Sequence, residues 1–327
     1  MACHWLRRAL LVLAPAAALF LAACGSGTIE SQFTPTRIVV FGDGMSDLGQ
    51  TSNDAVTNAR YTVNDNSVNV WVQQLAFDYG ILTNFIPAVS GGTAYATGNA
   101  RIAVKPDAAG NANTATVTQQ IDTFLAKGSL TATDLPVLSG GTADIIAEMA
   151  KVRAGTETSD QMIANVKAAG VALGGQVRRL VQAGAPHVLV VGVYDLSKSP
   201  WATATGQATL LNQASTQFND QLLLSIVDLG ANVLYVDAAL FFNLMVSSPG
   251  SYGLTDATTV VCTSLDTGPG IGLGADVSQI NSARCTSSTI YNAVNYGLYA
   301  WADFVYPTPT IHRQFGDYVY NRIRARW

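Results

Sequence analysis

The chain has 327 residues, a formal net charge of -4 and an apolar content of 49%, and 12% of its residues are charged. Charged residues usually make up about 25% of a soluble domain. The low charge, with no basic stripe along the sequence, argues against a nucleic-acid partner. The length suits a single α/β domain with a large core.

The N-terminus has the pattern of a bacterial secretory signal. Arg7 and Arg8 precede an uncharged, Ala- and Leu-rich run that ends at Cys24. This run is shorter than the about 20 residues that a membrane-spanning helix needs. Small residues directly before a Cys resemble a bacterial lipobox, in which the thiol is acylated. We therefore expect residues 1–23 to be a signal peptide, Cys24 to carry lipid, and residues 24–35 to form a tether.

The predicted lipid also indicates where the protein resides. Acyl chains on Cys24 would hold it on a membrane surface, because each buried CH₂ contributes about 0.8 kcal/mol to membrane binding. Gly25 follows the lipidated position, where inner-membrane lipoproteins of many Gram-negative species carry Asp. The sequence therefore predicts an exported protein anchored at the cell envelope, on the outer membrane if the host is Gram-negative.

Residues 36–327 show strand-like apolar runs that alternate with longer helix-like segments, which is typical of a parallel sheet covered by helices. The predicted strands cover residues 37–41, 134–139, 187–193 and 232–236. The predicted helices cover residues 68–79, 116–127, 159–183, 205–229 and 310–326. Segments 84–115 and 248–300 are expected to be long loops over one end of the sheet. No repeat and no second domain is indicated.

Two cysteines remain in the predicted mature domain, Cys262 and Cys285, within a stretch rich in Gly, Ser, Thr and Asp. In an exported protein such a pair favours a disulfide, which would contribute roughly 3 kcal/mol; two buried free thiols are the alternative. The mature chain keeps only His187 and His312, and neither has zinc-ligand spacing beside a cysteine. We expect neither a metal nor a cofactor.

Four segments resemble, in order, the sequence blocks of the GDSL (SGNH) esterase and lipase family. Residues 41–49 (FGDGMSDLG) resemble F-G-D-S-x-S-D-x-G, and residues 94–101 (AYATGNAR) resemble N-x-A-x-G-G-A. Residues 139–145 (SGGTADI) resemble G-x-N-D, and residues 301–308 (WADFVYPT) resemble W-D-x-x-H-P-T. The resemblance implies an α/β/α sandwich with a parallel, flavodoxin-like sheet. It also implies ester hydrolysis by a Ser nucleophile, a His base and an Asp.

Three positions that carry the family's chemistry are changed here. The nucleophile position is Gly44, which has no side chain and cannot attack an ester. The base position is Tyr306, whose phenol has an ordinary pKa near 10 and is a poor base at neutral pH. The side-chain oxyanion donor is replaced by Ala143, a loss that typically costs about 10²- to 10³-fold in kcat. These changes predict that the chain keeps the fold of the family but does not hydrolyse esters.

Other positions of the blocks are retained. Gly98 matches the family's backbone oxyanion donor, and Asp303 matches the triad carboxylate. Ser46 and His312 could in principle form a relocated catalytic set with Asp303. More ordinary roles are a helix-capping hydroxyl for Ser46 and a surface or packing imidazole for His312, while His187 is expected to be structural.

Asp43 and Asp144 follow predicted strands, and we expect them to support loops by hydrogen bonding. A glycosidase-like carboxylate pair is the alternative, although their spacing does not favour it.

Three functions follow from these residues. The first is a GDSL-like envelope lipoprotein that is inactive, with extra space above Gly44 in which an acyl, lipid or glycan ligand could bind. The second is an active ester hydrolase that uses Ser46 and His312. The third is a purely structural lipoprotein whose pocket is vestigial. If Tyr306 fills the space above Gly44, the third function is favoured over the first.

Overall fold

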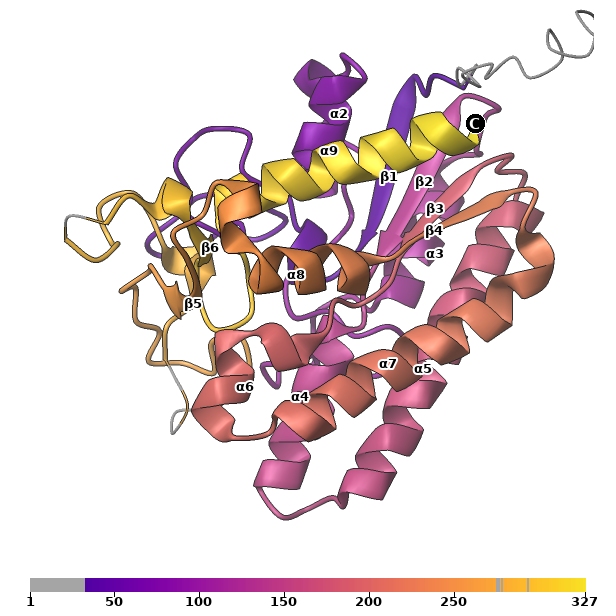
Figure 1. Cartoon of the computed structure of the whole chain (residues 1–327). Helices are drawn as coiled ribbons and strands as arrows, with labels where there is room; N and C mark the ends of the chain where they lie inside the picture. The colour runs from indigo at the N-terminus through magenta and orange to yellow at the C-terminus, as the bar shows by residue number, and fades with distance from the viewer. Residues whose placement is uncertain (1–32, 275–276, 278, 293) are drawn as a thin grey trace, which may run out of the picture.

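The computed structural model describes residues 33–327 except 275, 276, 278 and 293 (Figure 1). The predicted signal peptide, the predicted lipidation site Cys24 and most of the tether therefore lie outside the described residues. Within the described ranges, no helix combines the length and the apolar character that crossing a membrane requires.

The main sheet confirms the predicted α/β class. Its strands are β1 (Arg37–Gly42), β2 (Asp134–Ser139), β3 (Val188–Val191) and β4 (Val233–Val236), which pair in parallel in the order β1-β2-β3-β4. Almost all of their side chains are buried, as expected for continuous apolar runs in a parallel sheet covered on both faces. A one-residue parallel bridge from Val40 to Ala94 extends the sheet beyond β1.

Helices cover the sheet from two sides (Figure 1). Helices α2, α8 and α9 gather on one side, and the long helices α5 and α7 pack against each other on the other. The helices are α2 (Trp71–Asp78), α3 (Val117–Lys127), α4 (Thr142–Arg153), α5 (Ser159–Gln182), α6 (Pro200–Thr205), α7 (Ala208–Ile226), α8 (Ala238–Ser247) and α9 (Pro309–Arg326).

The structure differs from the predicted elements in several places. The sequence does not predict α4, α8 or most of α6. The helix expected over 205–229 begins only at Ala208, because Gly206 ends α6 with a φ of 67° in the left-handed region. The segment expected to be a loop over 248–300 contributes two short strands, β5 (Asp256–Val260) and β6 (Tyr299–Trp301), which pair in parallel.

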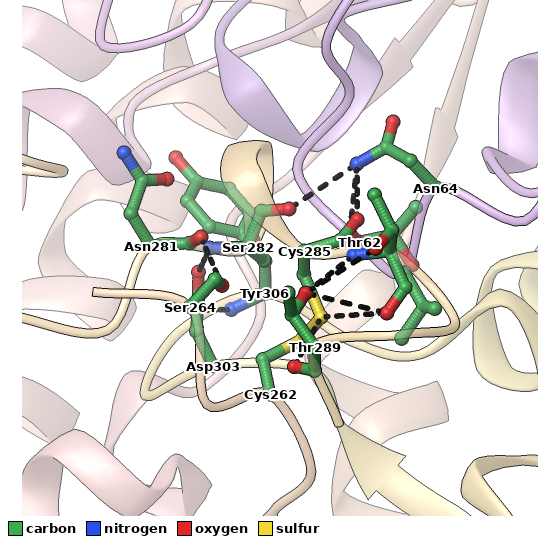
Figure 2. Close-up of a disulfide and its surroundings, with 12 residues drawn as sticks. Thr62, Asn64, Cys262, Ser264, Asn281, Ser282, Cys285, Thr289, Asp303 and Tyr306 are labelled. Atoms are coloured by element: carbon green, nitrogen blue, oxygen red, sulfur yellow. Dashed lines mark hydrogen bonds between the residues drawn. A yellow bond between two sulfur atoms is a disulfide. The ribbon is translucent and has the colours of Figure 1, made fainter. Parts of the chain in front are cut away.

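The predicted disulfide is confirmed: Cys262 and Cys285 are bonded, with an S–S distance of 2.02 Å (Figure 2). Both cysteines are fully buried, in a small apolar cluster with Val63, Val261 and Ala302 that is separate from the main core. The disulfide thus supplies the centre of the small cluster that holds the C-terminal loops together.

Candidate functional site

The loop after β1 is fixed by the carboxylate of Asp43. Its Oδ1 accepts from Met45 N at 3.1 Å, which caps the short 3₁₀ turn Gly44–Ser46, and its Oδ2 accepts from Ala143 N at 3.3 Å at the start of α4. Burial raises the pKa of Asp43 to about 7, although these amide donors favour the charged form. Asp43 therefore joins two of the segments that carry the GDSL-like blocks.

Tyr306 fills the space above Gly44. A Cβ built on Gly44 would lie 2.6 Å from Tyr306 Oη and 2.8 Å from its Cζ, which is closer than real Cβ contacts. The Tyr306 side chain is fully buried, and its Oη has no hydrogen-bond partner in the described part of the chain. Burial raises the pKa of this phenol well above its ordinary value, so it stays neutral and cannot act as a base at physiological pH.

The expected enlargement of the site at Gly44 is therefore wrong. The volume that a serine side chain would occupy is taken by an aromatic ring instead of being left open. A cavity beside this loop, lined in part by Met45, Thr142 and Tyr194, has a volume of about 10 Å³. That is room for about one water molecule and not for an acyl group.

The amide of Gly98 is also occupied. It donates to Asp47 Oδ2 at 2.7 Å, and Asp47 Oδ1 accepts from the amides of Gly49 and Gln50, both at 2.8 Å. A Cβ built on Gly98 would lie 2.0 Å from Tyr61 Oη. The donor that the resemblance assigns to an oxyanion thus binds a carboxylate of the chain itself and is covered by a phenol.

Tyr61 and Tyr306 pack against each other, with ring centroids 4.9 Å apart. Both rings are buried, and burial raises the pKa of each phenol well above its ordinary value. Together they cover Gly44 and Gly98 and exclude water from the segments where the resemblance places a reaction centre.

Asp303 positions the turn that carries Tyr306 (Figure 2). Its Oδ1 accepts from the amides of Val305 at 2.8 Å and Tyr306 at 2.7 Å, and its Oδ2 accepts from Ser282 N at 3.0 Å. These bonds occupy both oxygens of a fully buried carboxylate. The Asp303 carboxylate therefore holds the backbone of the neighbouring loops in place. It accepts no hydrogen bond from a histidine among the described residues.

Ser46 and His312 are buried and both contact Trp71. Trp71 Nε1 donates to Ser46 Oγ at 3.0 Å, and Trp71 N donates to His312 Nδ1 at 3.3 Å. No hydrogen bond joins Ser46, His312 and Asp303 in the portion of the chain that is described. The relocated catalytic set is therefore not assembled. The expected capping role of Ser46 is taken by Asp43, and His312 is a packing imidazole rather than a surface one.

His312 predicts a measurable pH dependence of stability. Burial lowers its pKa to about 3, and its Nε2 has no partner among the described residues. A His with a depressed folded-state pKa stabilises the fold above its unfolded pKa of about 6.5, and this contribution is lost as the pH falls toward 3. Relative to His312→Gln, the wild type should lose about 2 kcal/mol of unfolding free energy between about pH 7.5 and pH 5.

Urea unfolding of both proteins at the two pH values measures this difference, because the other titrating groups are common to both. Equal losses in wild type and variant would show that His312 is already protonated or exposed in the folded state.

Asp43 and Asp144 are held separately, as the loop-supporting role predicts. Asp144 Oδ1 accepts from Arg101 Nε at 3.3 Å and its Oδ2 from Ile102 N at 3.0 Å, while burial raises its pKa to about 6. The oxygens of both acids are occupied by protein donors, which leaves the glycosidase-like alternative without support. The described residues contain no group of three or more His, Cys, Asp or Glu side chains placed to hold a metal ion.

Sequence reasoning missed the cover that Tyr61 provides and the bond between Asp47 and the Gly98 amide. Tyr61 stands in a polar, non-periodic stretch, and no motif connects it to Gly98 or Tyr306. His187, expected to be structural, lies between Phe33 and Trp327, with ring centroids 4.4 and 4.3 Å away.

No protein-family model matches the chain. A Pseudomonas putida protein described as "Uncharacterized protein in trpE-trpG intergenic region" is 25% identical over 164 residues. This similarity covers 50% of the chain and 26% of that relative, so the chain corresponds to about a quarter of the relative's length.

Proposed function

We propose that the protein is a catalytically inert, GDSL/SGNH-like lipoprotein of the cell envelope with a flavodoxin-like α/β/α sandwich. The observation that carries the proposal is the contact of Tyr306 with Gly44, at the two positions that resemble the family's base and nucleophile. A hydrolase needs an accessible nucleophile beside a base. Here the nucleophile position has no side chain, and the base position holds a buried neutral phenol in its place.

The filled site favours a structural role over ligand binding at the former reaction centre. Asp43, Asp47 and Asp303 each use their carboxylates to fix neighbouring loops through backbone amides. All three side chains are fully buried. In an open site these three carboxylates would face a substrate. Here they hold together the loops at the carboxyl end of the sheet, which leaves no cavity there for an acyl, lipid or glycan ligand.

Hydrolysis of p-nitrophenyl acetate and p-nitrophenyl palmitate tests the proposal. The purified wild-type protein should release p-nitrophenol no faster than an equal concentration of Ser46→Ala, and neither should exceed the rate in buffer without protein. The competing function, an esterase that uses Ser46 and His312, requires clear turnover by the wild type that disappears in Ser46→Ala. That result would overturn the proposal, because it would place the nucleophile at Ser46.

A further inference from the structure

A second cavity, separate from the closed site, lies between the 101–105 loop, α4 and α5. Its volume is about 380 Å³, within the range of small-molecule sites. Helices α4 and α5 lie side by side in Figure 1 and are joined by a short turn. The cavity is thus framed by two helices and a loop tied to α4 through Asp144.

The cavity has a charged floor in which the acidic groups are already paired. Glu148 accepts from Arg101, from Lys151 Nζ at 2.8 Å and from Asn165 Nδ2 at 2.8 Å. Asp144 accepts from Arg101 Nε at 3.3 Å and from the Ile102 amide at 3.0 Å. Both carboxylates already accept hydrogen bonds from basic side chains of the protein, so the floor of the cavity does not favour a positively charged ligand.

Two basic side chains of this cavity keep donors that the neighbouring acids do not use, whereas Lys151 is paired with Glu148 and, at 3.4 Å, with Glu157. Arg101 uses its Nε and Nη2 for the two acids, and its Nη1 has no acceptor among the described residues although the side chain is only 8% exposed. Lys105 lines the same cavity and forms no ion pair in the described part of the chain. A nearly buried guanidinium with free N–H groups, beside an unpaired ammonium, matches an oxyanion in charge and hydrogen bonding.

The remaining wall is apolar and made of small side chains. It is formed by Ala103, Val104, Ala168, Ala169 and Ala172. The alanines on α5 leave room beside the helix, and Val104 is 48% exposed at the rim. A short aliphatic chain would bury this surface at about 25 cal/mol per Å² of apolar area.

We propose that this cavity binds a small aliphatic carboxylate. The carboxylate accepts hydrogen bonds from Arg101 Nη1 and Lys105 Nζ, and the alkyl chain lies against the alanines of α5. No bond is made or broken. The inference uses residues outside the closed site, and it stands whether or not the chain belongs to the GDSL family.

Isothermal titration with hexanoate tests the assignment, with hexylamine and inorganic phosphate as comparison ligands. Hexanoate should bind more tightly than phosphate, which lacks an alkyl chain, and hexylamine should not bind. Lys105→Gln should raise the Kd for hexanoate about tenfold, the size expected for one charge-assisted hydrogen bond. Lys105 is exposed, so this substitution should leave the fold intact.

Two matched substitutions on α5 distinguish blocking of the cavity from any general effect of a new Phe side chain on the protein. Ala168→Phe fills the cavity from an exposed position and should abolish hexanoate binding, whereas Ala164→Phe, one turn earlier and also exposed, should leave the Kd unchanged. Binding of hexylamine as tight as that of hexanoate overturns the proposal. So does binding of hexanoate no tighter than phosphate, or a Kd unaffected by both Lys105→Gln and Ala168→Phe.

Discussion

The double variant Gly44→Ser/Tyr306→His is expected to hydrolyse p-nitrophenyl acetate about 10- to 10²-fold faster than the wild type. In a related serine hydrolase mechanism, loss of the Ser or the His costs about 2 × 10⁶ in kcat, so restoring both returns a comparable factor. Ala143 would still lack a side-chain donor, and the Gly98 amide would still be bound to Asp47. Each missing oxyanion donor removes about 10²- to 10³-fold of that gain. The measurement is the steady-state rate of both proteins at equal concentration.

The single substitutions are the controls, because neither creates a nucleophile together with a base. Gly44→Ser alone brings a side chain within 2.6 Å of Tyr306 Oη. It should cost about 1–3 kcal/mol of unfolding free energy by overpacking. The His of the double variant is smaller than Tyr and should recover part of this loss in urea unfolding. A double variant that folds as stably as the wild type but shows no turnover would contradict the proposed family relationship.

Removing the disulfide should lower the unfolding free energy by about 3 kcal/mol in Cys262→Ser/Cys285→Ser. The two cysteines are 23 positions apart, so the bond removes loop-closure entropy from the unfolded chain. They also form the centre of a small cluster that has few other apolar side chains to stabilise it. Urea unfolding under oxidising conditions measures the difference.

The same experiment in excess reductant provides the control. Wild-type protein with reduced thiols should approach the stability of the double variant, while the double variant itself should not respond to reductant. A loss below about 1 kcal/mol would mean that the loop is fixed by other contacts. Ser282, three residues before Cys285, donates to Asp303, so a weakened loop should also loosen the turn that carries Tyr306.

The strands and the disulfide could be predicted because each depends on local information. β3 is a continuous run of β-branched and Leu residues, which in a parallel sheet is buried on both faces. If the domain is exported, as the N-terminal pattern predicts, its two remaining cysteines have few alternatives to pairing. Helix α4, in contrast, is buried on most sides from Thr142 to Met149, so its sequence lacks the apolar stripe by which a surface helix is detected.

The residues changed at the candidate site were visible in the sequence, but the consequence of those changes was not. A glycine at position 44 suggested empty space. Whether that space exists depends on where a ring 262 positions later in the chain comes to lie, and no local pattern encodes this. Tyr61 covers Gly98, and the Gly98 amide donates to Asp47. Both are likewise tertiary contacts between polar loops.

The bond between Asp47 and the Gly98 amide has a consequence for any molecule that competes for this end of the sheet. A carboxylate on the same chain is present at an effective concentration that a free ligand cannot approach in solution. If the proposed family relationship holds, Asp47 stands where the acid product of ester cleavage would rest. The protein then resembles a hydrolase held in its product complex, in which a side chain of the chain itself supplies the product carboxylate.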